Sequence, residues 1–272
     1  MKNIADGPLA SIIITNYNKS NFLLDSLKSS LKQTYKKKEI IFFDDKSTDS
    51  SLKKIKNFKI KNKYKFKIIT NLKKKKSFAT YNHISAVAKS LTKAKGKYIF
   101  LLDSDDYFHQ EKLKKIIKTF EKNKNCKFIL DQPILKYENK EIKKNFHYNL
   151  STNKWPKFPP TSCMCFEKKT LKRVLKKISF KKFPNLAIDF RLAVYYSLVL
   201  QEFLIHKSHL TFYRQVEESM DSKYIKYRSK EWWLRRYEAF EFLNLILKKN
   251  KLPTNKGVDF FVTRLLNKFL NI

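Results

Sequence analysis

Residues 96–108 read GKYIFLLDSDDYF, an apolar run that ends in aspartates at positions 103, 105 and 106. A continuous apolar run of this length, preceded by a glycine and followed by turn residues, is typical of a strand buried on both faces of a sheet. The aspartates would leave the strand at its carboxyl end, where open α/β sheets bind their ligands. The stretch therefore predicts a buried strand that delivers carboxylates to a site.

The same pattern occurs twice upstream. Residues 10–15 are apolar and β-branched and run into a polar turn over 16–20, and residues 39–43 run into Asp44 and Asp45. Between the strands the spacing predicts helices over 21–33, 50–58 and 77–91, and one more strand over 64–70. Strands that alternate with helices predict right-handed crossovers and an α/β, Rossmann-like, mainly parallel sheet flanked by helices.

The second half of the chain is less regular. Its pattern predicts short strands over 128–130 and 134–137, a proline-containing loop over 153–160, and helices over 168–177, 188–205 and 229–249. The last of these helices is apolar and aromatic on one side and basic on the other.

The chain is strongly basic, with 60 Lys and Arg against 24 Asp and Glu and a formal net charge of +36. Such a charge attracts nucleic acids, anionic membranes and polyanionic substrates. The excess is mostly lysine spread over the whole length, so a compositional bias explains it equally well. An apolar fraction of 42% with 23 Phe and 14 Tyr excludes a disordered chain.

Cysteines and targeting signals indicate the compartment. Cys126, Cys163 and Cys165 are an odd number without a second Cys/His pair at zinc-finger spacing, which favours buried free thiols over disulfides or a metal site. Residues 1–10 contain no apolar signal core, and no window reaches the roughly 18–20 apolar residues of a membrane span. We therefore expect a cytoplasmic protein.

The cluster from Asp103 to Asp106 carries the chemistry. Like charges this close repel one another unless a cation neutralises them, and Mg²⁺ or Mn²⁺ binds carboxylate oxygens together with phosphate oxygens. A metal with a diphosphate fits the cluster. The alternative is a cap for a helix that begins near Gln110.

Three stretches in this order resemble the signature blocks of inverting family 2 glycosyltransferases with the GT-A fold: SIIITNYNKSNFLLDSLKSSLKQTY at 11–35, KEIIFFDDKSTDSS at 38–51 and GKYIFLLDSDDYF at 96–108. The resemblance is close over about the first 115 residues and looser afterwards. It implies a GT-A domain over 1–215, with a nucleotide-binding half to about 115 and an acceptor-binding half over 116–215. A helical extension over 216–272 follows.

The resemblance also implies roles for single side chains. Donor-nucleotide contacts are implied for Thr15, Tyr17, Asn18, Asp44, Asp45, Asn82, Asp103, Ser104, Asp105 and Arg214. Acceptor contacts are implied for Thr161 and Ser162, and Asp105 and Asp106 would hold the Mn²⁺ or Mg²⁺ that bridges the two phosphates.

Asp189 matches the family's catalytic base at the start of a helix in the second half. It would take the proton of the acceptor hydroxyl, although a carboxylate that stabilises the first turn of a helix is the alternative reading. Two positions depart from the family pattern. Lys73 to Tyr81 replace a turn in which many relatives carry an Arg-Asn or Gly-containing motif, with Asn82 as the nearest polar candidate. Val216 stands where relatives often carry a His that can ligate the metal.

The expected activity is the metal-dependent, inverting transfer of a hexose from a nucleoside diphosphate sugar, with a UDP-sugar favoured. The acceptor would be a hydroxyl of a glycan or of a lipid-linked sugar in cell-surface polysaccharide or lipopolysaccharide synthesis. A catalytically silent scaffold is one alternative. A nucleic-acid-binding protein is another, but it would gather Lys and Arg on one face, and the even spread of Lys favours no nucleic-acid partner.

The basic helix over 229–249 permits peripheral contact with the anionic inner leaflet of a membrane. Packing of this helix against the catalytic domain is the alternative.

Overall fold

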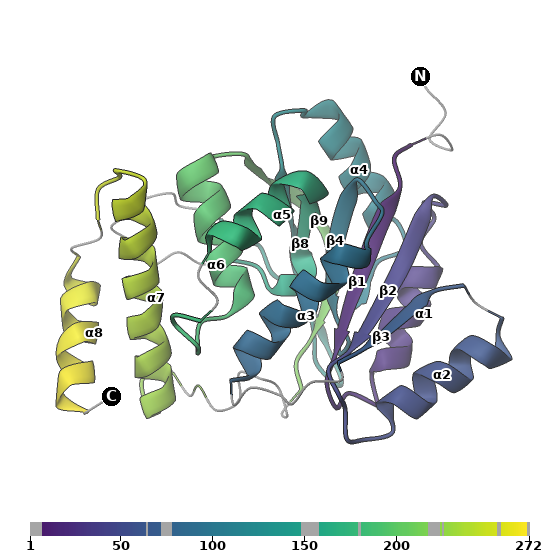
Figure 1. The fold of residues 1–272 in the computed structure, drawn as a ribbon, viewed down its shortest axis with the longest axis horizontal. Coiled ribbons are helices and arrows are strands. Elements are labelled where there is room, and N and C mark those ends of the chain that lie inside the picture. Colours follow the sequence, from purple (N-terminus) through teal and green to yellow (C-terminus); the bar gives the residue numbers. More distant parts are fainter. Residues whose placement is uncertain are drawn as a thin grey trace.

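The computed structural model describes residues 7–63, 65–71, 78–147, 158–178, 181–216, 224, 226–254 and 257–270. In these parts of the chain, one nine-stranded sheet runs in the order β3-β2-β1-β4-β8-β6-β9-β5, with β7 paired to β6. Helices cover both faces of the sheet (Figure 1). The predicted loop over 153–160 is described only from residue 158, and Lys73 to Lys76 lie outside the described residues.

The first four long strands are parallel. They are β1 (Ala10–Asn16), β2 (Lys38–Asp44), β3 (Lys67–Thr70) and β4 (Tyr98–Asp103), and β1 lies between β2 and β4. Because parallel strands share a direction, their carboxyl ends lie at one edge of the sheet. The strands predicted over 10–15, 39–43 and 97–102 are therefore confirmed to within a residue or two at each end.

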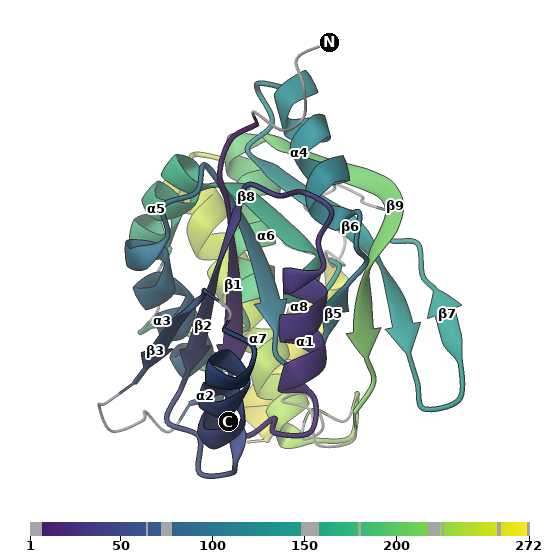
Figure 2. The same cartoon turned by 90° about the vertical axis from the view of Figure 1, so that its right-hand side faces the viewer.

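The other strands form the mixed half of the sheet. They are β5 (Tyr107–Phe108), β6 (Phe128–Lys136), β7 (Glu141–Lys143), β8 (Met164–Glu167) and β9 (Phe203–Arg214). β6 and β9 are parallel, whereas β8 runs antiparallel to both β4 and β6. Figure 2 shows β7 standing out beyond β6 at this side of the molecule.

Two apolar clusters cover the two faces of the sheet, because successive side chains of a strand point to opposite faces. Ile12 and Ile14 of β1 join one cluster with α1 (Leu23–Leu31), α2 (Ser51–Lys61) and α4 (Lys112–Lys122). Ile13 joins the other cluster, whose helices are α3 (Ala79–Lys93), α5 (Lys168–Lys177), α6 (Ile188–Val194) and α7 (Lys230–Lys249). Two short elements, η2 (Thr161–Cys163) and η3 (Tyr195–Leu200), complete this part of the fold, and α8 (Val258–Phe269) packs on α7.

One predicted helix is wrong in its extent. The helix expected over 188–205 comprises α6 and the π-helix η3, and the chain then enters β9 at Phe203. Gln201, with a φ of 54°, adopts the left-handed conformation that terminates many helices. The two short strands expected over 128–130 and 134–137 form the single strand β6, whose pairing with β9 shifts register near Gln132.

The helix predicted over 229–249 is confirmed as α7, and the hydroxyl of Ser229 accepts a hydrogen bond from the backbone N–H of Trp232 at its start. Phe242, Leu243 and Ile246 of α7 are buried in the second apolar cluster. Packing against the rest of the fold therefore accounts for this part of the apolar side of α7. In the described parts of the chain, no helix is both long enough and apolar enough to cross a bilayer.

The cysteines are free thiols, as expected. Cys163 and Cys165 are buried and Cys126 is half-buried. Burial raises the pKa of the Cys126 thiol to about 11, so this group is a thiol and not a reactive thiolate near neutral pH.

Gly96 lies where the turn after α3 meets β1. Its backbone N–H donates to the hydroxyl of Ser11 at 2.9 Å. A Cβ atom at this position would stand 2.6 Å from the backbone nitrogen of Ser11, closer than real Cβ contacts allow. The glycine is therefore required by the close approach of two backbone segments.

We predict that Gly96→Ala destabilises the fold, because backbone atoms of β1 cannot move aside as a side chain can. Overpacking of this kind costs about 1–3 kcal/mol, which lowers the melting temperature by several degrees in a thermal unfolding experiment. Gly7→Ala is the control. The Cβ atom there would meet the Tyr35 side chain and not backbone atoms, so a smaller loss is expected. Equal losses in the two variants would contradict this account.

Candidate functional site

The register of the parallel strands brings the predicted donor residues together. Thr15 of β1 lies beside Asp103 of β4, and Asn16 lies beside Asp44 of β2. These residues end their strands at one edge of the sheet, next to the start of α3 (Figure 1). Asp103, the last residue of β4, and Asp105 and Asp106, which follow it, each have a different environment at this edge.

Asp103 is held by two side chains. Its Oδ1 accepts a hydrogen bond from the hydroxyl of Thr15 at 2.9 Å and lies 3.0 Å from Nε2 of His83 on α3. Burial by itself raises the pKa of the Asp103 carboxyl, but the charge and the hydrogen bond of His83 outweigh it, so the pKa lies below its ordinary value. The Asp103 side chain is 28% exposed, which leaves it accessible from the edge of the sheet.

His83 lies at the centre of the acidic group. Its Nε2 also lies 3.2 Å from the hydroxyl of Thr15, and its side chain is 12% exposed. Burial lowers the pKa of the imidazole, but Asp103 outweighs this effect, and Asp189 and Asp105 also raise the pKa. His83 was not among the site residues predicted from the sequence, because a single histidine within a helical pattern carries no local signal.

Asp105 pairs with a cation from the loop after β1. Its Oδ2 lies 3.1 Å from Nζ of Lys19, and both side chains remain partly exposed, at 20% and 17%. Burial and the charge of Asp103 together raise the pKa of Asp105 although Lys19 opposes them. Among the three aspartates, Asp105 is the one whose ion-pair partner is the long, flexible side chain of a lysine, Lys19.

Asp106 is buried within the protein, with 1% exposure. One oxygen accepts a hydrogen bond from the hydroxyl of Ser162 at 2.5 Å, and the other accepts one from the backbone N–H of Arg214 at 2.9 Å. Burial and the neighbouring charges of Asp105 and Asp103 raise the pKa of Asp106 well above its ordinary range. Both oxygens are thus committed to η2 and β9.

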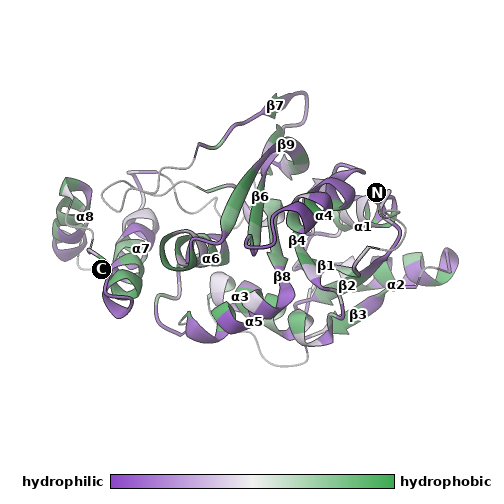
Figure 3. Cartoon of the chain, turned by 90° about the horizontal axis from the view of Figure 1, so that it is seen from above, coloured by the Kyte–Doolittle hydropathy of each residue, from purple (hydrophilic) through white to green (hydrophobic). Residues whose placement is uncertain are grey.

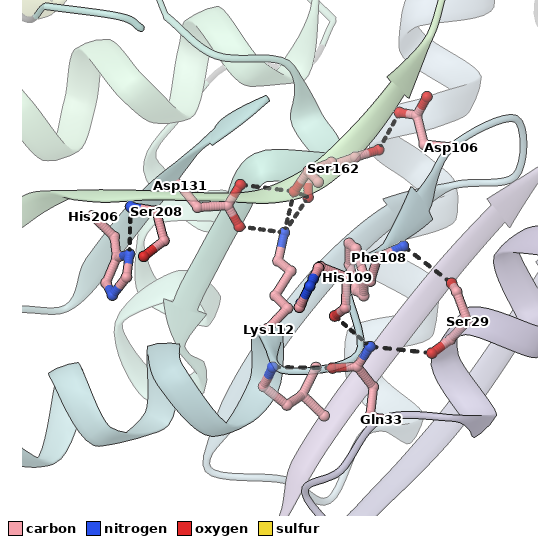
Figure 4. Close-up of polar contacts among 12 residues, drawn as sticks. Ser29, Gln33, Asp106, Phe108, His109, Lys112, Asp131, Ser162, His206 and Ser208 are labelled. Carbon is pink, nitrogen blue, oxygen red and sulfur yellow. Dashed lines mark hydrogen bonds and ion pairs between the residues drawn. The ribbon is translucent and has the colours of Figure 1, made fainter. Parts of the chain in front are cut away.

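A buried ion pair supports Ser162 from below (Figure 4). Nζ of Lys112 lies 2.7 Å from Oδ2 of Asp131 and donates to the carbonyl oxygen of Ser162 at 2.6 Å. Burial by itself lowers the pKa of Lys112, but the Asp131 carboxylate outweighs it and keeps the amine charged. The hydroxyl of Ser162 in turn accepts the N–H of Asp103 at 3.0 Å and donates to Asp106. The core ion pair is therefore connected to both ends of the aspartate segment.

The other end of the strand edge is built around Asp44 and Asp45. Asp44 is fully buried, and its oxygens accept hydrogen bonds from Asn16 and Ser47, so it shapes the loop after β2. Asp45 is 7% exposed and accepts a hydrogen bond from the side-chain amide of Asn71 at 2.8 Å. Asn71 follows β3 directly, and its side-chain oxygen accepts a hydrogen bond from Lys89.

The loop after β1 closes over this end. The side chain of Asn18 bonds to Thr48, and its backbone N–H donates to Ser47. Tyr17 is 47% exposed on the same loop. These two loops therefore form one hydrogen-bonded rim, with an aromatic ring on its surface.

The other side chains predicted to contact the donor are those of Arg214, Ser104 and Asn82, and they are bonded elsewhere or partly buried. The guanidinium of Arg214 pairs with Asp25 of α1 at 3.0 Å, and only its backbone N–H reaches Asp106. Ser104 is buried, and its N–H donates to the carbonyl of Thr15. Asn82 is half-buried on the first turn of α3, next to His83.

The two predicted acceptor residues are buried. Thr161 is 6% exposed and Ser162 is fully buried in η2. Their position gives Ser162 a supporting role beneath Asp103 and Asp106, and neither side chain presents its hydroxyl at the surface.

Asp189 lies in the first turn of α6 and is half-buried. Its charge raises the pKa of His83, so the two groups lie within electrostatic range of each other. The hydroxyl of Thr80 on α3 donates to the carbonyl of Pro184, which ties the start of α3 to the segment before α6. A residue 86 positions beyond Asp103 in the sequence is thereby brought to the edge of the sheet.

A divalent cation fits this edge only if phosphate oxygens of a bound substrate supply some of its ligands. Among the described residues, no three His, Cys, Asp or Glu side chains gather in a way that could hold a metal ion. Asp106 uses both oxygens within the protein, which leaves Asp103 and Asp105 as the partly exposed carboxylates. Asp103 is held by Thr15 and His83, whereas Asp105 pairs with the side chain of Lys19 and can turn toward a cation. Mg²⁺ is commonly bound by one or two carboxylates together with substrate phosphates, and the residues present fit that kind of site.

The sequence has relatives with assigned names. It is 33% identical to glycosyltransferase EpsE of Bacillus subtilis over 45% of this chain and 42% of that protein. It is 36% identical to the Escherichia coli enzyme WfaP, named a UDP-Glc:alpha-D-GlcNAc-diphosphoundecaprenol beta-1,3-glucosyltransferase, over 51% of this chain and 48% of that protein. The match thus spans less than half the length of these two relatives. TuaG of B. subtilis, named for teichuronic acid biosynthesis, is 26% identical over 87% of this chain and 91% of its own length.

Solved structures share the fold. TarS residues 1–349 of S. aureus, in complex with UDP-GlcNAc, superposes with a TM-score of 0.61 at 17% identity, over 96% of this chain and 71% of that one. The mannosyltransferase PcManGT of Pyrobaculum calidifontis, in complex with GDP-Man and Mn²⁺, gives 0.59 at 12% identity, over 92% and 67%. The expected GT-A architecture, a mixed and mostly parallel sheet flanked by helices with further helices at the C-terminal end, is confirmed.

The profile of the family described as "Glycosyl transferase family 2" matches residues 11–193, which include Thr15, Asp45, Asp103, Asp105 and Asp189. The chain belongs to glycosyl transferase family 2.

Proposed function

We propose that this glycosyltransferase moves a hexose from a UDP-sugar to a hydroxyl group of a glycan or of a lipid-linked sugar, with inversion at the anomeric carbon. One observation carries the proposal: His83 of α3 lies 3.0 Å from Asp103 at the carboxyl edge of the parallel strands, and the charges of Asp105 and of Asp189 on α6 act on the same imidazole and raise its pKa. Such an edge is where open α/β sheets bind nucleotides.

The site divides into parts with different tasks. The rim around Asp45, Asn71 and Tyr17 would receive the base, since Asp45 is a carboxylate that can accept a hydrogen bond from a base N–H. Asp103 and Asp105 would face the ribose and the diphosphate, with Lys19 nearby. On this view residues 1–115 bind the donor, residues 116–215 bind the acceptor, and residues 216–272 form the helical extension.

Asp189 would act as the general base. The acceptor hydroxyl is a poor nucleophile until its proton is removed, and a carboxylate with partial exposure can take that proton as the oxygen attacks the anomeric carbon. The bond to the diphosphate breaks on the opposite side of the sugar, which inverts the configuration. A bound Mn²⁺ or Mg²⁺ would neutralise charge on the departing diphosphate.

The names of similar proteins support the choice of donor and acceptor. WfaP is named for UDP-Glc and a diphosphoundecaprenol-linked acceptor, and TarS has been crystallised with UDP-GlcNAc. TuaG is named for the synthesis of a cell-surface polymer. We therefore propose a place in cell-surface polysaccharide or lipopolysaccharide synthesis, at the cytoplasmic face of the membrane, where a lipid-linked acceptor would be met.

We predict that UDP together with Mn²⁺ raises the melting temperature more than GDP, CDP or dTDP, and more than UDP with EDTA. A ligand at one hundred times its Kd adds about 2.7 kcal/mol of stability. Asp105→Asn should remove the contribution of Mn²⁺ and retain part of the contribution of UDP. Glu138→Gln, a change of the same kind at an exposed position after β6, is the control. Absence of stabilisation by every nucleotide would refute the donor site.

Asp189→Asn should bind UDP as the wild type does and lose transfer by a factor of about 10²–10⁴, the usual contribution of a general base. Nucleotide-induced thermal shifts measure binding, and release of UDP in the presence of acceptor measures transfer. Retention of transfer in this variant would remove Asp189 from the mechanism.

His83→Phe should weaken donor binding, because Asp103 and Thr15 would lose the side chain that orients them. Loss of a hydrogen bond to a charged group costs about 1.5–3 kcal/mol, so a rise of roughly tenfold or more in the donor KM is expected. His83→Gln, which keeps an N–H donor, should lose less. His147→Phe alters an exposed histidine and serves as the control. A donor KM equal to that of the wild type in His83→Phe would contradict this role.

A further inference from the structure

Helix α8 turns most of its large apolar side chains outward, whereas Phe260 packs on Phe240 of α7. Five of them are exposed, at 79% for Val258, 55% for Phe261, 44% for Val262, 55% for Leu265 and 75% for Phe269. Spacings of three, four, seven and eleven residues place all five on one face of a helix. A surface helix of a globular domain usually turns this face inward, so α8 has the opposite arrangement.

The inward face of α8 is partly polar and is held by specific bonds. Thr263 and Asn267 are buried against α7, where Nε of Arg236 donates to the hydroxyl of Thr263 and the amide of Asn267 donates to the carbonyl of Trp233. Arg236 also pairs with Asp259 at 2.9 Å. These contacts fix the rotation of α8 about its axis, so the exposed apolar face is a consequence of the packing.

The exposed face lies at one end of the molecule. In Figure 1 α8 is the outermost element, beyond α7 and at the opposite end from α2. Figure 3 shows the same position from above, with α8 at the edge of the fold. A 12-residue helix is about 18 Å long, so the apolar face is a narrow, convex strip.

Charge indicates what covers this strip. Arg264 and Lys268 are exposed on α8 beside it, and Lys248, Lys249 and Lys251 are exposed at the end of α7. The whole chain carries a net charge of +36. A second copy would bring the same charge and meet repulsion. A stable protein interface also buries about 800 Å² on each partner, more than one such strip offers.

We propose that α8 docks on an anionic lipid surface, with Phe261, Leu265 and Phe269 inserted among the lipid headgroups and the flanking cations near lipid phosphates. An apolar helical face bordered by Lys and Arg is the arrangement that binds membrane interfaces. This surface is separate from the sugar-transfer site, so the proposal does not depend on the proposed reaction.

Flotation with vesicles tests the proposal. The full chain should float with vesicles of phosphatidylcholine mixed with phosphatidylglycerol, and much less with phosphatidylcholine alone. The triple variant Phe261→Ser, Leu265→Ser, Phe269→Ser should lose at least tenfold in its partition onto the mixed vesicles. Ile60→Ser is the matched control, because Ile60 is 77% exposed on α2 and the change in chemistry is the same. This control should bind as the wild type does.

Three results with vesicles would overturn the proposal: no binding of the wild type to the mixed vesicles, equal binding of the triple variant and the wild type, or equal losses in the triple variant and in Ile60→Ser. A concentration-dependent dimer in analytical ultracentrifugation that the triple variant abolishes would assign the strip to a second copy and overturn it as well. The triple variant should keep its thermal shift with UDP, which separates failure of membrane docking from failure of the donor site.

Discussion

Crowding of three carboxylates behind one strand is the constraint on which the site depends. Asp103, Asp105 and Asp106 fall within four residues, and their mutual repulsion opposes the compact turn that holds them. The fold resolves this by giving each carboxylate different partners: His83 and Thr15 for Asp103, Lys19 for Asp105, and Ser162 with a backbone N–H for Asp106. As a result the pKa differs along the segment. The pKa of Asp103 at the strand end is lowered, whereas burial raises the pKa of Asp106 and disfavours its charged form.

The support for this arrangement extends into the core. Lys112 and Asp131 are fully buried, and such a pair is stable only when its remaining hydrogen-bonding capacity is satisfied. Ser162 satisfies part of it through its carbonyl oxygen while its hydroxyl holds the aspartate segment. The buried Lys112–Asp131 pair and the partly exposed acidic edge are therefore parts of one hydrogen-bonded network. Ser162, which was expected to contact the acceptor, links the two.

The sequence predicted well wherever the signal was local. The apolar runs of β1, β2 and β4 and the helical spacing of α5 and α7 appear in the structure close to their expected bounds. Prediction failed where the outcome depended on distant packing: the helix after Asp189 ends at a left-handed residue, Gln201, because the chain must turn there to pair β9 with β6. The outward apolar face of α8 also depends on bonds to Arg236 and Trp233 that no local pattern reveals.

The sequence by itself determined the family, the extents of β1, β2 and β4 and the positions of Asp45, Asp103 and Asp105 at strand ends, because each is encoded in a few consecutive residues. Only the tertiary structure decided which of these groups meet and what charge they favour. Their partners lie far along the chain, as with the Asp106 and Arg214 pair at a separation of 108 residues. Hydrogen bonds and pKa values depend on distances in space, and those distances are set when the two halves of the sheet join.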